Sequence, residues 1–133
     1  MRNFQTLDKI TVDPQSDILT LSVSTDSDHS PVLAMRREGA YTVISASYGP
    51  LEIALRPRLE ELARMLGRLQ PVEGLQTTRQ VGTGQAYLAL GLRRDGTLIM
   101  RPTIAVDATG HLSMNLALTP HIRQGFYEWL PVV

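Results

Sequence analysis

The chain has 133 residues, of which 43% are hydrophobic and 20% are charged, and this composition predicts one globular domain over residues 1–133. Thirteen basic residues balance thirteen acidic ones, which excludes a strong overall attraction to nucleic acid or anionic membranes, and the absence of cysteine excludes disulfides and thiolate chemistry. No apolar run reaches the roughly 18 residues of a membrane helix and residues 1–5 lack the apolar core of a signal peptide, so we expect a cytoplasmic protein with no membrane partner.

The first half of the chain alternates apolar and polar residues with the period of two that is typical of half-buried strands. We predict strands over residues 9–13, 18–25, 31–37, 40–48 and 51–56. A helix over residues 57–70 follows, since Pro57 suits a first helical turn and Pro71 ends the run. Its apolar stripe consists of leucines at helical spacing, namely Leu59, Leu62, Leu66 and Leu69.

The second half repeats this pattern of strands followed by a helix. Residues 71–85 have the weakest periodicity, with a short strand considered over residues 77–81. We then predict strands over residues 86–93, 97–107 and 111–119 and a helix over residues 120–130. Thr119 is the expected N-cap, with Pro120 in the first turn. The apolar stripe of this helix is Ile122, Phe126 and Leu130.

Loop length predicts the register of the three strands in the second half. Each connecting loop, residues 94–96 and residues 108–110, has three residues and ends in glycine. A three-residue loop with glycine in its left-handed position pairs even-numbered residues with even-numbered ones. Because the large apolar residues of all three strands are even-numbered, we predict an antiparallel meander with one apolar face in the core.

Two features recur in the same order in both halves. Residues 33–39 resemble residues 90–96, with an Arg-Arg-acid-Gly turn in each, and residues 54–59 resemble residues 117–122, where a strand leads into a proline-started helix. We therefore predict an α+β fold of two repeated antiparallel β-meander–helix halves, roughly ββββα twice, related by a pseudo-twofold axis. The halves span about residues 9–70 and 77–131.

The sequence contains no catalytic motif, so we predict neither enzyme activity nor a cofactor. Asp26, Asp28 and His29 combine carboxylates with an imidazole, but the spacing lacks the glycine and the later glutamate of a calcium loop. We interpret this segment as a solvated loop with no metal, and keep a metal or small-molecule site there as a third hypothesis. His111 is expected to pair with Asp107 across a hairpin end.

The face of the second meander opposite the core carries polar and small side chains. Arginines there can bind phosphates while a tyrosine stacks on a base, and residues 74–106 hold four arginines against one acidic residue. Alanines and Ile99 on the same face are typical of a surface that another layer covers. Arg36 is the repeat equivalent of Arg93. The candidate binding residues are therefore Arg36, Tyr87, Arg93, Arg101 and Asn115.

The order of about four strands and a helix, twice over, resembles the Whirly family of single-strand-binding proteins. In that family two sheets radiate from a helical core, protomers assemble through the helices, and DNA lies across the sheets. The resemblance implies the same architecture and the same kind of ligand. The Lys-Gly-Lys signature of the family is absent, since residues 34–37 read Ala-Met-Arg-Arg, so no functional residue is carried over.

These observations lead to a primary functional hypothesis and an alternative. The primary hypothesis is a non-enzymatic single-stranded nucleic-acid-binding or regulatory module that uses the arginine-bearing sheet face. The alternative is a protein-interaction or assembly module, chaperone-like, with an unknown protein partner and no nucleic acid, in which that face is an interface. Under both we expect self-association, because edge strands and amphipathic helices commonly need a partner.

Overall fold

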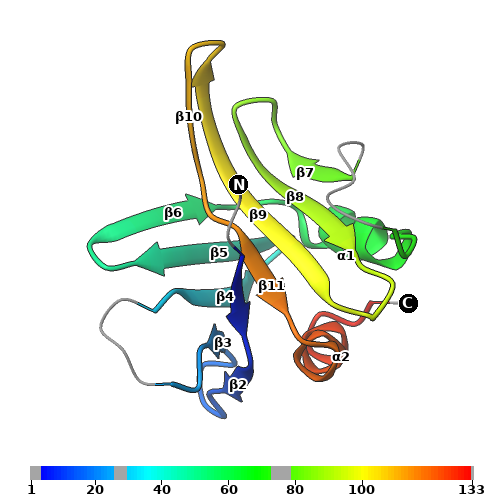
Figure 1. Ribbon diagram of the computed structural model, residues 1–133. Coiled ribbons are helices and arrows are strands. Elements are labelled where there is room, and N and C mark those ends of the chain that lie inside the picture. The colour runs from blue at the N-terminus through cyan, green and yellow to red at the C-terminus, as the bar shows by residue number, and fades with distance from the viewer. Residues whose placement is uncertain (1–3, 26–29, 73–78, 133) are drawn as a thin grey trace.

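The computed structural model describes residues 4–25, 30–72 and 79–132, which form two β-sheets and two helices (Figure 1). The α+β class predicted from the sequence is confirmed. The elements in chain order are β1 (Gln5–Leu7), β2 (Lys9–Val12), β3 (Leu19–Ser22), β4 (Val32–Glu38), β5 (Tyr41–Tyr48), β6 (Leu51–Leu55), α1 (Leu59–Gly67), β7 (Gln80–Gly82), β8 (Ala86–Leu92), β9 (Leu98–Asp107), β10 (Gly110–Ser113), β11 (Leu116–Leu118) and α2 (Pro120–Trp129).

The first sheet is an antiparallel meander in which the strands follow chain order, β2-β3-β4-β5-β6. Its register places Met35 opposite Ile44 and Leu33 opposite Ala46, so these apolar side chains share one buried face. All five strands predicted for this half are confirmed to within a few residues. The alternation was readable because one face of this sheet packs on the core and the other does not.

The second sheet has the order β1-β11-β9-β8-β7, and β10 also pairs with β9. Leu92 lies opposite Leu98 and Leu112 opposite Ile104, so the even-with-even pairing and the antiparallel meander are confirmed. The three-residue loop predicted over residues 108–110 is wrong, because Gly110 pairs with Asp107 and a register shift between Gly110 and His111 restores the even pairing. The predicted strand over residues 111–119 is divided into β10 and β11. Strand β7 lies at the end of the segment considered over residues 77–81, of which residues 77 and 78 are outside the described part.

Strand β1 was not predicted. It pairs in parallel with β11, with Gln5 opposite Leu116 and Leu7 opposite Leu118, and so brings the start of the chain beside its last strand. Leu7 is completely buried and belongs to the main hydrophobic core. Three residues are too few to show a period of two, which is why the sequence pattern did not reveal this strand.

Helix α1 begins later than predicted, at Leu59 instead of Pro57. The backbone N–H of Thr42 donates to the carbonyl of Pro57 (2.9 Å), and the N–H of Leu59 donates to the carbonyl of Ala40 (2.9 Å). Because these bonds tie the segment to β5, residues 57–58 stay extended and the helix starts after them. The predicted leucine stripe packs against the core.

Helix α2 begins at Pro120, and the Oγ1 of Thr119 accepts a hydrogen bond from the N–H of Ile122 (3.3 Å), as the capping pattern predicted. The predicted stripe residues are buried, and the helix contacts β2, β3 and β11. Neither helix in the described part of the chain has the length and apolarity needed to cross a bilayer.

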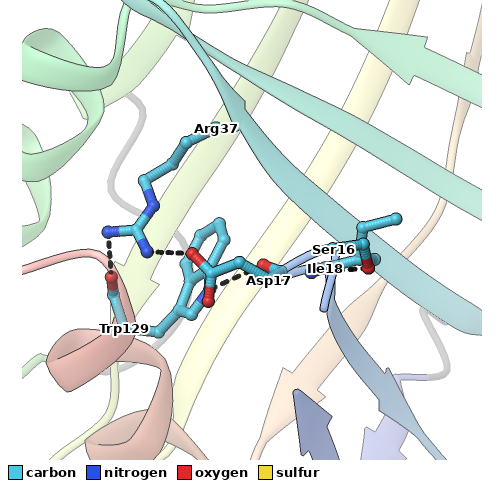
Figure 2. A network of polar contacts seen from close by, with 5 residues as sticks. All are labelled: Ser16, Asp17, Ile18, Arg37 and Trp129. Carbon is cyan, nitrogen blue, oxygen red and sulfur yellow. Dashed lines mark hydrogen bonds and ion pairs between the residues drawn. The ribbon is translucent and has the colours of Figure 1, made fainter. Parts of the chain in front are cut away.

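Arg37 joins helix α2 to the first sheet (Figure 2). Its guanidinium donates to the carboxylate of Asp17 and to the carbonyl of Trp129 (2.9 Å). The indole Nε1 of Trp129 in turn donates to the carbonyl of Asp17 (3.1 Å). Asp17 has a left-handed backbone (φ 59°), a conformation that aspartate tolerates better than most residues. The three residues therefore form one hydrogen-bond network that connects the loop before β3, strand β4 and the C-terminal end of α2.

The two helices lie toward one side of the molecule in Figure 1, and the β9–β10 and β5–β6 hairpins extend away from them. Apolar side chains near these hairpin ends remain exposed, including Leu51 (52%), Leu112 (47%) and Val106 (72%). Near the ends of these two hairpins, therefore, some apolar side chains are left uncovered by the rest of the described chain.

Candidate functional site

Four of the five predicted binding residues share one face of the second sheet. The register places Ala89 opposite Arg101 and Tyr87 opposite Thr103, so Tyr87 and Arg101 lie on the face opposite the core. Alternation along β8 adds Arg93 to this face. The β10–β9 register, continued by the hydrogen bond between Met114 and Pro102, adds Asn115. The length of the loop over residues 94–96 had predicted this arrangement for the residues of β8 and β9.

The fifth residue, Arg36, lies on the first sheet and does not join this surface. It is opposite Val43 on β4, on the face that points away from the core, and its guanidinium forms an exposed ion pair with Glu38 (3.0 Å). The structure therefore places Arg36 and Arg93 on two different sheets.

The centre of the predicted face is covered. Ile99 is 1% exposed, and Thr103 and Ala117 are each 2% exposed. Ile99 lies between Gly91 and Ala117 on the neighbouring strands, which leave room for its side chain. The alanines and Ile99 had indicated a covered surface, and the cover is formed within the chain itself.

Phe4 and Arg93 form part of this cover. The Arg93 guanidinium lies 5.4 Å from the centroid of the Phe4 ring. Phe4 leads into β1 and Arg93 follows β8, and strands β11 and β9 lie between those two strands. Their side chains must therefore meet across the two intervening strands, and the register places Ile99 midway between them.

Arg101 is also held by contacts within the chain. Its Nε donates to the Oγ of Ser113 on β10 (3.2 Å), and it has further contacts. Both Arg101 and Tyr87 are half-buried. The two arginines of the predicted face are thus engaged in contacts within the chain, and they do not stand free above the sheet.

Asn115 leads to a different feature, an apolar groove of about 210 Å³ between the two sheets. The groove is lined by Leu112 and Asn115 from the second sheet and by Tyr48 and Leu51 from the first. None of its nine lining residues is charged. We call this feature the β10 groove.

The β10 groove collects three of the most exposed large apolar side chains in the described part of the chain. Tyr48 is 41% exposed, Leu51 is 52% exposed and Leu112 is 47% exposed. Leu112 belongs to the even-numbered apolar series of the meander, but it lies at the groove beside the end of the β5–β6 hairpin and remains 47% exposed. Sequence reasoning missed the groove because its walls come from two sheets whose relative position no local pattern records.

One buried acceptor close to the β10 groove lacks a donor. The Oδ1 of Asn115 is inaccessible to solvent, and no donor in the described residues bonds to it. Buried amide oxygens in native proteins are nearly always hydrogen-bonded, so an unpaired one needs an explanation. Asn115 lies on the sheet face opposite the core, whereas the groove is lined by the core-facing Leu112, Met114 and Leu116, so this acceptor does not point into the groove.

The predicted pair between His111 and Asp107 is wrong. The Oδ1 of Asp107 accepts from the backbone N–H of Thr109 (2.7 Å), and hydrogen bonds from the side chain and then the backbone of Thr109 lower the pKa of Asp107 below its ordinary value. A register shift between Gly110 and His111 leaves His111 opposite Ala105. The Asp107 carboxylate therefore bonds to Thr109 in its own turn, and the hairpin-end ion pair with the His111 imidazole does not form.

The metal hypothesis is not addressed by the structure. Asp26, Asp28 and His29 lie outside the described residues. Among the residues that the structure describes, no three histidine or acidic side chains are grouped so that they could hold a metal ion.

Comparisons of this chain with protein-family models, with curated proteins and with solved structures give no match. The resemblance to the Whirly family stays a prediction.

Proposed function

We propose that this protein is a protein-interaction module that holds an apolar segment of its partner in the β10 groove. The observation that carries the proposal is the convergence of Tyr48, Leu51 and Leu112, all exposed, on one groove between the two sheets whose described lining residues are uncharged. Contiguous exposed apolar surface in a folded chain costs free energy in water and is typical of interaction sites.

A protein segment fits the β10 groove better than a small molecule does. The groove holds about 210 Å³, less than the roughly 300–1,000 Å³ of most small-molecule sites. Among the residues that the structure describes, no charged side chain lines the groove, and this part of its wall offers no cation for a phosphate or a carboxylate. Apolar side chains on a longer segment would fill such a shallow site while the rest of the segment contacts its rim.

Single-stranded nucleic-acid binding, the primary hypothesis from the sequence, has less support. Stacking on Tyr87 and phosphate contacts from Arg93 and Arg101 require these side chains to be accessible, but all three are half-buried. The contact between Arg93 and Phe4 and the bond from Arg101 to Ser113 would have to be exchanged for nucleic-acid contacts. This favours the protein-interaction alternative, and self-association remains part of the proposal.

We also propose that the two meander–helix halves are a repeat. In chain order β2 to β6 precede α1, and β8 to β11 precede α2, which is the order that the sequence comparison of the halves predicted. A pseudo-twofold relation between the halves is compatible with this order but needs a superposition of the two halves for its test.

Peptide selection tests the proposed function. A displayed library of random peptides of about 12 residues is selected on the purified protein, and the enriched peptides are measured by fluorescence anisotropy. We expect apolar peptides whose affinity falls at least tenfold in Leu51→Ser and Leu112→Ser. Val106→Ser is the matched control, because Val106 is 72% exposed but does not line the groove.

Two results would overturn this proposal. One is the failure to select any peptide that depends on Leu51 and Leu112. The other is tight binding of a single strand of about 30 nucleotides that weakens between about 50 and 200 mM salt and is reduced by Arg101→Ala. The second result would establish the nucleic-acid hypothesis in its place.

A further inference from the structure

One face of the first sheet is open to solvent. Along β3, β4, β5 and β6, the residues that point into the core are buried, whereas none of the residues between them, which point to the other side, is buried. We call this second side the outer face. Tyr48 and Leu51, which line the β10 groove, lie on the core side of the same sheet, so the outer face is separate from the groove.

The strand register arranges the outer face in rows that run across the strands. The middle row consists of small residues that are partners on successive strands, namely Thr20, Ala34, Ser45 and Ala54. On β4, Val32 is the centre of the row on one side and Arg36 the centre of the row on the other. Small side chains in the middle let a second sheet approach to the spacing of about 10 Å that face-to-face packing requires.

Val32 projects from its row, because its neighbours on β3 and β5 are the smaller Ser22 and Ser47. A hollow of about 100 Å³ lies on the Arg36 side of the face, and it is lined by Ile18, Ala34, Met35, Arg36, Val43 and Ser45. The guanidinium of Arg36 turns along the strand to Glu38 (3.0 Å). A twofold rotation about an axis along the middle row brings Val32 of each copy toward the hollow of the other.

Strand β6 ends the outer face with two opposite charges. Glu52 pairs with Ser47, in the row of Val32, and Arg56 lies in the row of Arg36, since the residue before it, Leu55, pairs with Ile44. The side chains of Glu52 and Arg56 are both exposed. The same rotation brings Glu52 of each copy opposite Arg56 of the other, so the two copies attract each other along this edge.

Strand β2, at the other edge, has the same arrangement with the signs reversed. Lys9 pairs with Ser22, and Asp13 lies beside Ile18, whose carbonyl accepts its N–H (3.0 Å). Both charged residues are exposed. The rotation brings Lys9 opposite Asp13 of the second copy, so opposite charges meet at all four corners of the face. A rotation about an axis along β4 would instead place Arg36 against Arg36 of the second copy, which disfavours that orientation.

We propose that two copies of the chain pack their outer faces together in a dimer whose twofold axis runs across the strands at Ala34. Such an interface is self-complementary, as twofold symmetry requires. Five short strands about 4.8 Å apart give the face roughly 500 Å² on each copy, which is at the low end of specific interfaces. We therefore expect a weak dimer, and the β10 groove stays accessible in it.

Sedimentation equilibrium of the purified chain tests the dimer between about 1 and 200 μM. Ala34→Arg places two charges at the centre of the interface and should raise the dissociation constant at least about tenfold. Ala108→Arg, in the exposed turn between β9 and β10, is the matched control and should change it less than about twofold. Circular dichroism verifies the fold of both variants. A chain that stays monomeric, or a dimer that Ala34→Arg does not weaken, would overturn the inference.

Charge exchange on β6 tests the orientation of the two copies. Glu52→Lys puts a lysine opposite Arg56 of the second copy, and Arg56→Glu puts a glutamate opposite Glu52, so each variant alone should dimerise at least about tenfold more weakly. An equal mixture of the two variants should restore the dimer, because each introduced charge then faces an opposite one. Glu60→Lys, the same change on α1, is the control and should dimerise like the parent chain.

The outcomes separate this inference from the proposed function, on which it does not depend. A mixture of the two charge variants that dimerises no better than either alone would overturn the orientation across the strands. If peptides bind the β10 groove but the chain is monomeric, only the dimer is wrong. If the chain dimerises as described and no peptide depends on Leu51 and Leu112, only the groove proposal is wrong.

Discussion

The guanidinium of Arg37 lies over the indole ring of Trp129, 4.7 Å from its centroid, and donates a hydrogen bond to the carbonyl of the same residue. One side chain thus contacts both the ring and the backbone at the C-terminal end of α2. A cation at this end of a helix also interacts favourably with the helix dipole.

We expect Arg37→Ala to lower the free energy of unfolding by about 2 kcal/mol, since it removes the cation–π contact and the bond to the helix carbonyl. Arg36→Ala is the matched control. Arg36 is the adjacent residue and makes only an exposed ion pair with Glu38, so its loss should cost less than about 0.5 kcal/mol. Urea unfolding of both variants measures the difference, and equal losses would contradict the role of Arg37.

The contact between Phe4 and Arg93 should be measurable as a coupling. A double-mutant cycle with Phe4→Ala and Arg93→Ala is expected to give about 0.5–1 kcal/mol between the two side chains. Arg94→Ala in place of Arg93→Ala is the control, because Arg94 is exposed in the adjoining turn. A coupling near zero for Arg93 would show that the two side chains do not together cover Ile99.

Asn115→Leu is expected to change neither the stability of the fold nor binding at the β10 groove. Because the Oδ1 of Asn115 has no donor in the described residues, removing it should leave the free energy of unfolding unchanged or slightly higher. Because the Asn115 side chain lies on the sheet face opposite the β10 groove, the same substitution should leave the affinity of the selected peptide unchanged. A clear loss of stability would indicate that Asn115 is bonded within the chain.

Two glycines in one loop region should respond differently to alanine. Gly82 has a φ of 124°, and a Cβ there would lie 2.5 Å from the carbonyl oxygen of Ala86. We expect Gly82→Ala to cost about 2 kcal/mol or more, through strain at this turn. A Cβ at Gly84 meets nothing within 4 Å, so Gly84→Ala should stay within about 0.5 kcal/mol. Thermal unfolding of both variants measures the two losses of stability, and equal losses would contradict the prediction.

Asp8 should contribute to acid sensitivity. The backbone N–H and then the hydroxyl of Ser24 donate to its carboxylate, which lowers the pKa of Asp8 below the ordinary value of 3.8. A carboxyl with a lowered pKa in the folded state stabilises the fold above about pH 4, and this contribution is lost as the pH falls through the folded-state pKa.

The corresponding experiment compares Tm between pH 7 and pH 2. Asp8→Asn should lower Tm at neutral pH, and its difference from the parent protein should shrink in acid. Glu52→Gln, an exposed carboxylate on β6, is the control and should show a smaller difference at neutral pH. A difference for Asp8→Asn that does not vary with pH would contradict the assignment.

The meanders could be predicted from the sequence because their determinants are local. The three-residue loop ending in Gly96 sets the register of Tyr87, Arg93 and Arg101. The second loop was predicted wrongly, because Gly110 pairs with Asp107, and a register shift after Gly110 is what returns Asn115 to the same face. The alternation of apolar residues identified the core face of each sheet without knowledge of what it packs against.

The features that were missed depend on contacts between distant parts of the chain. The late start of α1 results from bonds between residues 57–59 and β5, and β1 is defined by its pairing with β11. The β10 groove forms because Tyr48 and Leu51 lie beside Leu112, although they belong to a different sheet. The use of Arg93 to cover Ile99, instead of a ligand, is likewise a tertiary contact that composition does not record.

The pairing of β1 with β11 has a consequence for how the protein is made. The first sheet consists of neighbours in sequence and can form as soon as its strands leave the ribosome, but β1 has no partner strand until β11 is synthesised near the other end of the chain. Closing so long a loop is entropically costly and slow. We therefore expect completion of the second sheet to be the last step of folding, with Leu7 exposed to chaperones until then.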